Sequence, residues 1–207
     1  MAHLHKLQNL VEQRQIPFGK ANLPAERGPL ENILDGTLGE GKVVSLSGFI
    51  VNARYGNTDT GDSANCNQPG SENNDLQFNI SQSSVSLPKA KVEADKLLCE
   101  TALVEISPHF RPKGWELAAL TSLQNKHLPV RITGQLYFDA SHSVCKNGVP
   151  PPDGSPARAT LWEIRPVYGI EVCSEKDVDL CGDGSWKRLA LSSASRVIRR
   201  AISKTTH

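Results

Sequence analysis

The segment that decides the fold is ALVEISPHFRPKGWELAALTSLQNKHLPVRITGQLYF, residues 102–138. Its first six residues alternate between two faces in the manner of a strand, and Pro108 ends that pattern. Three leucines follow Gly114 at three-residue spacing, which predicts a helix over residues 115–126. Alternation resumes over residues 130–138, where Gly134 marks a bend. The segment therefore predicts a strand, a helix and a second strand.

Three more strands are expected outside this segment. Residues 43–55 are rich in β-branched and aromatic side chains, with Gly48 at the point where a long strand bends. Residues 76–81 and 162–172 alternate in the same way. The complete order is three strands, one helix and two strands. That order predicts a mainly β protein with an OB-fold-like barrel, a five-stranded Greek-key barrel with one helix between strands 3 and 4, plus terminal helices.

The 207 residues divide into a central body and two peripheral segments. Residues 1–40 are expected to form an N-terminal helix, with apolar residues at helical spacing near its start, and an extended arm rich in Pro and Gly. Residues 41–173 hold the predicted barrel. Residues 174–207 are expected to form a basic C-terminal helical tail. No apolar run approaches the length of a transmembrane span.

The net charge of +1 conceals a separation of charge along the chain. Residues 184–207 contain six basic residues and no acidic residue, which leaves the rest of the chain at −5. An amphipathic basic helix binds phosphate backbones or anionic lipid, or docks on the acidic body of its own chain. The sequence leaves these three alternatives open. It also predicts a contact with an anionic surface through residues 187–204.

Five cysteines are present, and no two form a CxxC pair, which argues against a zinc ribbon. Cys173 and Cys181 flank a short polar segment and are placed to close a small loop. Cys66 and Cys145 lie in two polar loops, and a bridge between them is one way to hold those loops together. Disulfides suit an oxidising compartment, yet the first residues lack the apolar core of a secretory signal. Cytoplasmic and extracytoplasmic locations are therefore equally expected.

Four segments resemble OB-fold-like bacterial domains of unassigned chemistry. They are NDLQFNIS (74–81), VEISPHFRP (104–112), VRITGQLYFDASH (130–142) and WEIRPVYGIEVC (162–173). The resemblance covers about residues 41–173 and supports the predicted fold. It also implies that many relatives carry histidine where this chain has Gln77 and Arg165.

OB-folds bind ligands on the face of strands 2 and 3, between the loops that follow strands 1 and 4. Here those loops are residues 57–75 and 142–158, and both are long enough to indicate a function. The sequence thus predicts a binding module for an extended polymer, single-stranded nucleic acid before oligosaccharide. The basic and aromatic candidates could equally be surface charges and core residues. The candidate ligand residues are Arg54, Tyr55, Gln77, Asn79, Phe110, Arg111, Arg158 and Arg165.

A second hypothesis is a metal-assisted phosphodiesterase on the same barrel. Carboxylates and histidines hold metals that activate water, and arginines stabilise a phosphoryl transition state. Strand parity places Glu105, Glu163 and Arg165 on outer faces. The first hypothesis requires no cofactor, whereas this one requires a divalent metal. Its candidate residues are Glu105, His109, Asp139 and His142. A third hypothesis is a structural domain whose loops contact another protein.

Overall fold

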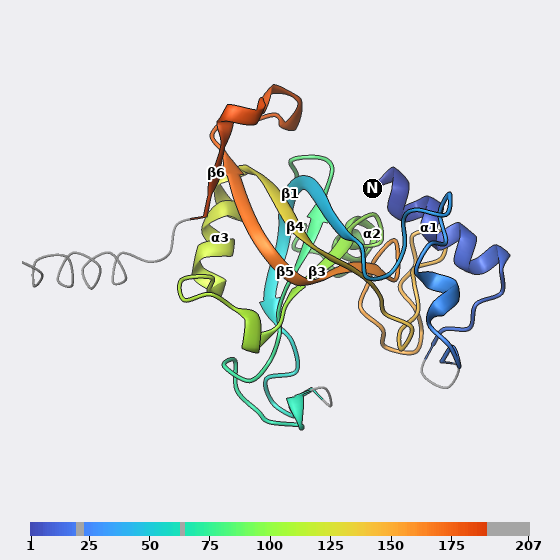
Figure 1. Ribbon diagram of the computed structural model, residues 1–207. Helices are drawn as coiled ribbons and strands as arrows, with labels where there is room; N and C mark the ends of the chain where they lie inside the picture. The colour runs from blue at the N-terminus through green and yellow to red at the C-terminus, as the bar shows by residue number, and fades with distance from the viewer. Residues whose placement is uncertain (20–22, 63–64, 190–207) are drawn as a thin grey trace, which may run out of the picture.

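A computed structural model describes residues 1–19, 23–62 and 65–189. Five long strands form the body, and Figure 1 shows them wrapping around a common centre. Within the described residues, the strands are β1 (Val43–Tyr55), β2 (Leu76–Ser81), β3 (Ala102–Ile106), β4 (Pro129–Phe138), β5 (Trp162–Cys173) and the short β6 (Trp186–Arg188). The helices are α1 (Ala2–Gln13), α2 (Lys91–Leu98) and α3 (Leu117–Lys126). Short 3-10 turns lie at Gly28–Leu30, Pro108–Phe110, Val178–Leu180 and Asp183–Ser185.

The five long strands close into a mixed barrel. β2 pairs antiparallel with β1 and β3, and β4 pairs antiparallel with β1 and β5. β3 and β5 complete the circle in parallel pairing at Val104 and Ile164. α3 lies between β3 and β4, as predicted. This closed five-stranded arrangement confirms the mainly β prediction and is consistent with an OB-like fold.

Strand β1 serves both sides of the barrel by bending at Gly48. Val43 to Phe49 pair with β4, whereas Phe49 to Tyr55 pair with β2. A Cβ atom on Gly48 would lie 2.4 Å from the backbone oxygen of Ser81, so no larger residue fits without displacing β2. The bend predicted from this glycine is therefore confirmed, and its cause is the close approach of two backbones.

Two apolar clusters hold the molecule together. The first fills the barrel and is closed by Trp115 and by Leu120 and Leu123 of α3. In the second, Leu7 of α1 and Leu30 pack with Trp162 and other residues of β4, β5 and the loop that joins them. Figure 1 shows α1 and α3 at opposite ends of the barrel. The N-terminal segment is thus packed on the body through its apolar side chains.

Two elements differ from the prediction. α2 was not predicted, and none of its residues is fully buried. The expected helical tail begins instead with β6, whose residue Trp186 pairs with Cys173 and lies under Arg131 at 4.8 Å. The rest of the predicted tail helix, residues 190–207, lies outside the described residues. In the part of the chain that the structure describes, no helix has the length and apolar character to cross a membrane.

The disulfides agree with one predicted pairing and correct the other. Cys173 and Cys181 are bonded, as their spacing suggested. Cys145 is bonded to Cys99 rather than to Cys66, which is exposed and unbonded. The reason is that Cys99 ends α2, and its Cα lies 5.5 Å from that of Cys145. This bond fastens the loop between β4 and β5 to the segment that leads into β3.

Candidate functional site

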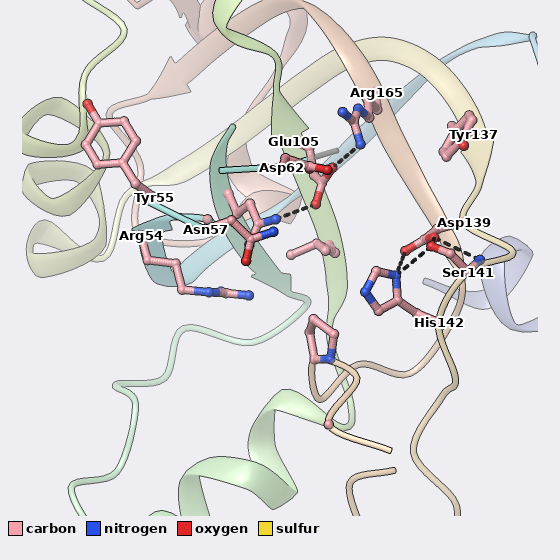
Figure 2. Close-up of a pocket in the computed structure, with 15 residues that line it drawn as sticks. Arg54, Tyr55, Asn57, Asp62, Glu105, Tyr137, Asp139, Ser141, His142 and Arg165 are labelled. Carbon is pink, nitrogen blue, oxygen red and sulfur yellow. Dashed lines mark hydrogen bonds and ion pairs between the residues drawn. The ribbon is translucent and has the colours of Figure 1, made fainter. Parts of the chain in front are cut away.

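A polar cavity of about 500 Å3 lies over the outer face of β2 and β3. Both long loops contribute to its walls. Asn57 comes from the loop after β1, and His142 and Pro156 come from the loop after β4. Figure 2 shows Asn57 and His142 with an open space between them. The two loops therefore meet over the strand face at which OB-folds bind their ligands.

Glu105 and Arg165 form an ion pair in the wall of this cavity. Oε2 of Glu105 accepts a hydrogen bond of 2.8 Å from Nη1 of Arg165, and its Oε1 accepts one of 2.7 Å from Nε2 of Gln77. Nη2 of Arg165 also lies 2.8 Å from Oδ2 of Asp75. Burial raises the pKa of Glu105 to about 7, against the opposing charge of Arg165. Glu105 therefore exchanges a proton near neutral pH.

The guanidinium of Arg158 is buried behind the cavity wall that carries Asp139. The side chain of Arg158 is 0% exposed, and its Nη1 donates a hydrogen bond of 3.0 Å to Oε2 of Glu163. Its Nη2 donates to Oδ2 of Asp139. Burial raises the pKa of Glu163 well above its ordinary value. Burial acts in the same direction on Asp139, but the hydrogen bond from His142 and the charge of Arg158 outweigh it and hold that pKa well below its ordinary value.

The ionised Asp139 orients His142. Nδ1 of His142 lies 2.6 Å from Oδ2 of Asp139 and 3.1 Å from Oγ of Ser141. A carboxylate only accepts hydrogen bonds, so Nδ1 carries the proton and Nε2 is left with a free lone pair when the ring is neutral. Figure 2 shows this ring reaching from the loop into the open space. The wall thus presents an acceptor nitrogen to whatever enters.

Two arginines line the cavity, and the charge of Arg54 is less compensated than that of Arg165. Its Nη1 donates a hydrogen bond of 3.1 Å to Oδ1 of Asn79, a neutral amide. Within the described residues, no carboxylate forms an ion pair with it, whereas Arg158 and Arg165 each hold two. Burial lowers the pKa of Arg54, which reflects the cost of keeping this charge away from water. Figure 2 shows its guanidinium directed toward the open space.

The cavity brings together residues from both sequence hypotheses. Four candidates for ligand binding and three candidates for catalysis line it: Arg54, Tyr55, Gln77, Arg165, Glu105, Asp139 and His142. Sequence parity also placed Asn79 and Glu105 on the outward side of the strands. They do lie on that side, but they are buried there because the long loops cover it.

Tyr55 lines the cavity, but its ring points away from the open space, and the guanidinium of Arg111 lies 5.3 Å from the centre of that ring. The remaining candidates lie outside the cavity. Arg111 itself donates to backbone oxygens of the 57–75 loop, including that of Ser71 at 2.9 Å. His109 and Phe110 lie on an exposed 3-10 turn outside the cavity. The Arg158 and Asn79 side chains lie behind the wall. Arg158 donates a hydrogen bond to Asp139, and Asn79 accepts one from Arg54.

The lining residues that were not sequence candidates include Tyr137, Ser141 and Asn57. Tyr137 precedes Asp139 by two positions, and the alternation of β4 already placed it on the same outer face. Ser141 and Asn57 belong to loops without a periodic pattern, so their positions carried no comparable signal. Tyr137 is therefore the residue that closer attention to strand parity would have found.

The stability of the protein is expected to fall as the pH rises from about 4.5 to 7. The folded state binds more protons than the unfolded state in this window, because the pKa of Glu105 is about 7 when folded and 4.5 in its ordinary range. The difference corresponds to at most about 3 kcal/mol. Asp139 acts oppositely, and its contribution is lost only below about pH 4. Thermal unfolding between pH 4.5 and 7.5 at constant ionic strength measures the slope.

The variant Glu105→Gln is expected to flatten this dependence. Asp75 and Glu163 also have raised pKa values, so part of the slope persists in the variant. A wild-type protein that becomes more stable between pH 5 and 7 would contradict the assignment of a protonated carboxyl group at Glu105.

In the part of the chain that the structure describes, no three His, Cys, Asp or Glu side chains are grouped so as to hold a metal ion. What the cavity offers instead is an unpaired guanidinium, an oriented imidazole and a carboxyl group that titrates near pH 7. Comparisons with protein-family models, with curated proteins and with solved structures found no match for this chain, so the geometry of the cavity carries the functional argument.

Proposed function

We propose that this protein is a binding module for single-stranded nucleic acid, with the phosphate backbone held at the cavity over β2 and β3. The single observation that carries the proposal is Arg54, a largely buried guanidinium that faces the cavity and is bonded only to a neutral amide. Burying a cation without a carboxylate partner destabilises the folded protein unless a bound anion compensates its charge. A phosphate group supplies such an anion and matches the planar fork of arginine.

Two acidic residues of the cavity, Glu105 and Asp139, do not stand against an anionic ligand, because their charges are already compensated. Glu105 is paired with Arg165, and burial raises its pKa to about 7. Asp139 is held by Arg158 and His142. Of the arginines that line the cavity, Arg54 is therefore the one that no described carboxylate holds in an ion pair.

Base stacking requires an aromatic ring at the cavity, and Tyr137 supplies it under this proposal. Its side chain lines the cavity and is 37% exposed. The guanidinium of Arg27 lies 5.2 Å from the centre of the ring and helps to fix its orientation. The ring of Tyr55 points away from the open space and Phe110 lies outside the cavity, so Tyr137 is the ring proposed for stacking. Stacking of this kind tolerates any base, which suits binding without sequence preference.

The variant Arg54→Gln is expected to bind a fluorescent single-stranded 20-mer roughly 10- to 100-fold more weakly, since a hydrogen bond to a charged group is lost. The slope of log affinity against log salt should also become shallower by about 0.7, the value for one phosphate contact on a single strand. Fluorescence anisotropy between about 50 and 200 mM salt measures both quantities.

The matched control for this experiment is Arg131→Gln. Arg131 is paired with Glu171 on the protein surface and lies outside the cavity, so its removal changes the net charge equally. Both proteins keep the full basic tail, which adds its own salt dependence to each. Equal affinity of the two variants would show that the cavity does not hold the phosphate backbone.

A further inference from the structure

We infer that the same cavity catalyses metal-independent cleavage of RNA, with His142 as general base, Glu105 as general acid and Arg54 as the phosphate-binding group. The inference rests on the proposed function, since it requires a strand bound at Arg54. It goes beyond binding because the cavity contains two proton-transfer groups that binding alone does not need.

The base is prepared by a chain of three residues. Arg158 is fully buried and holds Asp139, and Asp139 in turn holds Nδ1 of His142 at 2.6 Å. This chain fixes the tautomer in which Nε2 is the free acceptor. Asp139 and Arg158 are positioning residues here, because neither is directed at the ligand. An aspartate that orients a histidine is a recurrent arrangement for general-base catalysis.

The acid lies across the open space from the base. Figure 2 shows Glu105 and His142 on different sides of the space that Arg54 enters. Glu105 is 5% exposed, and its two oxygens are held by Gln77 and Arg165, so its orientation is fixed. The charged or titratable groups that act on it are Arg165, Asp75, Arg158 and Asp139. Their combined effect, with burial, leaves a proton available near neutral pH.

The reaction is a transfer of one phosphoryl group within the strand. Nε2 of His142 takes the proton from a ribose 2′-hydroxyl, and the 2′-oxygen forms a bond to the adjacent phosphorus. The bond from phosphorus to the 5′-oxygen breaks, and Glu105 gives its proton to that oxygen. The products are a 2′,3′-cyclic phosphate and a 5′-hydroxyl, so no water, metal or oxidant is consumed. Arg54 stabilises the negative charge on the non-bridging oxygens.

The test uses the full chain with two matched 20-mers in a metal chelator. One is entirely DNA, and the other contains a single ribonucleotide. We expect both to bind equally and only the second to be cut, at the ribonucleotide, with a 2′,3′-cyclic phosphate identified by mass spectrometry. The rate should fall as the pH rises through about 7, as Glu105 loses its proton. Equal binding with an intact ribonucleotide linkage overturns the inference and leaves the proposed function standing.

Variants separate catalysis from binding. His142→Asn and Glu105→Gln should each slow cleavage by about 100-fold or more, the usual contribution of a proton-transfer group. Circular dichroism of each variant shows whether the fold is kept, and the anisotropy assay measures its binding of the DNA 20-mer, so that the loss of cleavage is compared with any loss of binding. His5→Asn, on the exposed side of α1, is the matched control for the loss of a histidine outside the cavity and should cut like the wild type. Cleavage that survives in His142→Asn overturns the inference, and absent binding of both strands overturns the proposed function first.

Discussion

Replacing Arg158 by methionine is expected to lower the free energy of unfolding by about 3–5 kcal/mol, the range for breaking a buried ion pair by removing one partner. Arg158 has 0% exposure and joins Asp139 to Glu163. Methionine fills much of the same volume but leaves two carboxyl groups in the interior without their cation. The loss should be larger at pH 8 than at pH 5, because at lower pH the orphaned carboxyl groups take up protons.

Urea unfolding monitored by near-ultraviolet circular dichroism measures this change, which corresponds to a fall in Tm of about 10 °C for a chain of this size. Arg131→Met is the matched control. Arg131 pairs with Glu171 at 2.7 Å on the surface, where such pairs contribute less than about 1 kcal/mol. Similar losses in the two variants would mean that Arg158 is not the central buried cation described above.

Removal of the bond between Cys99 and Cys145 is expected to lower the free energy of unfolding by about 4 kcal/mol. The two residues are 46 positions apart, and closing a loop of this length restricts the unfolded chain by about that amount in the chain-entropy model. The double variant Cys99→Ala with Cys145→Ala should also bind nucleic acid more weakly, because the loop that carries His142 loses its fastening. Calorimetry of the double variant, followed by the anisotropy assay, measures both effects.

The second disulfide provides the control for this variant. Cys173 and Cys181 are only 8 positions apart, so their removal should cost about 2.5 kcal/mol by the same model. Their loop follows β5 at the end of the barrel near α3, and neither cysteine lines the cavity. An equal loss of affinity in both double variants would show that general destabilisation, rather than the cavity wall, is responsible.

The strands were predictable because each one separates an inner from an outer face. Phe78 and Ile80 face the core while Gln77 does not, and this alternation is visible in the sequence without any knowledge of the partner strands. α3 was predictable for a related reason, since Leu120 and Leu123 close one end of the barrel. Gly48 was informative because only a glycine allows the backbone of β2 to approach so closely.

The parts that could not be predicted depend on contacts between distant residues. None of the α2 side chains is fully buried, so the helix lacks the core residues that mark α3, and without α2 the pairing of Cys99 with Cys145 has no visible basis. Local spacing was enough only for Cys173 and Cys181. Likewise, alternation placed Glu105 and Arg165 on outer faces, but only the closed barrel brings β3 beside β5 and joins their charges.

The cavity required one further kind of information, the path of each loop. Asp139 and His142 are three residues apart, and their spacing alone did not show that a buried Arg158 would hold one and thereby orient the other. His109 appeared to be an equally good candidate from its place after β3. The turn at Pro108–Phe110 instead carries it to the surface, which a sequence pattern does not record.

The short pairing between β3 and β5 determines where thermal motion first opens the barrel. The other neighbouring strands share long ladders, whereas these two meet at the Val104–Ile164 pair, so few backbone hydrogen bonds oppose their separation. Opening should therefore begin between β3 and β5, and protection from amide hydrogen exchange should be weakest there. The Glu105–Arg165 pair lies beside this pairing and faces the cavity. A nucleic-acid strand bound across the cavity would consequently hold β3 and β5 together. Ligand binding and local opening of the barrel would then be linked equilibria.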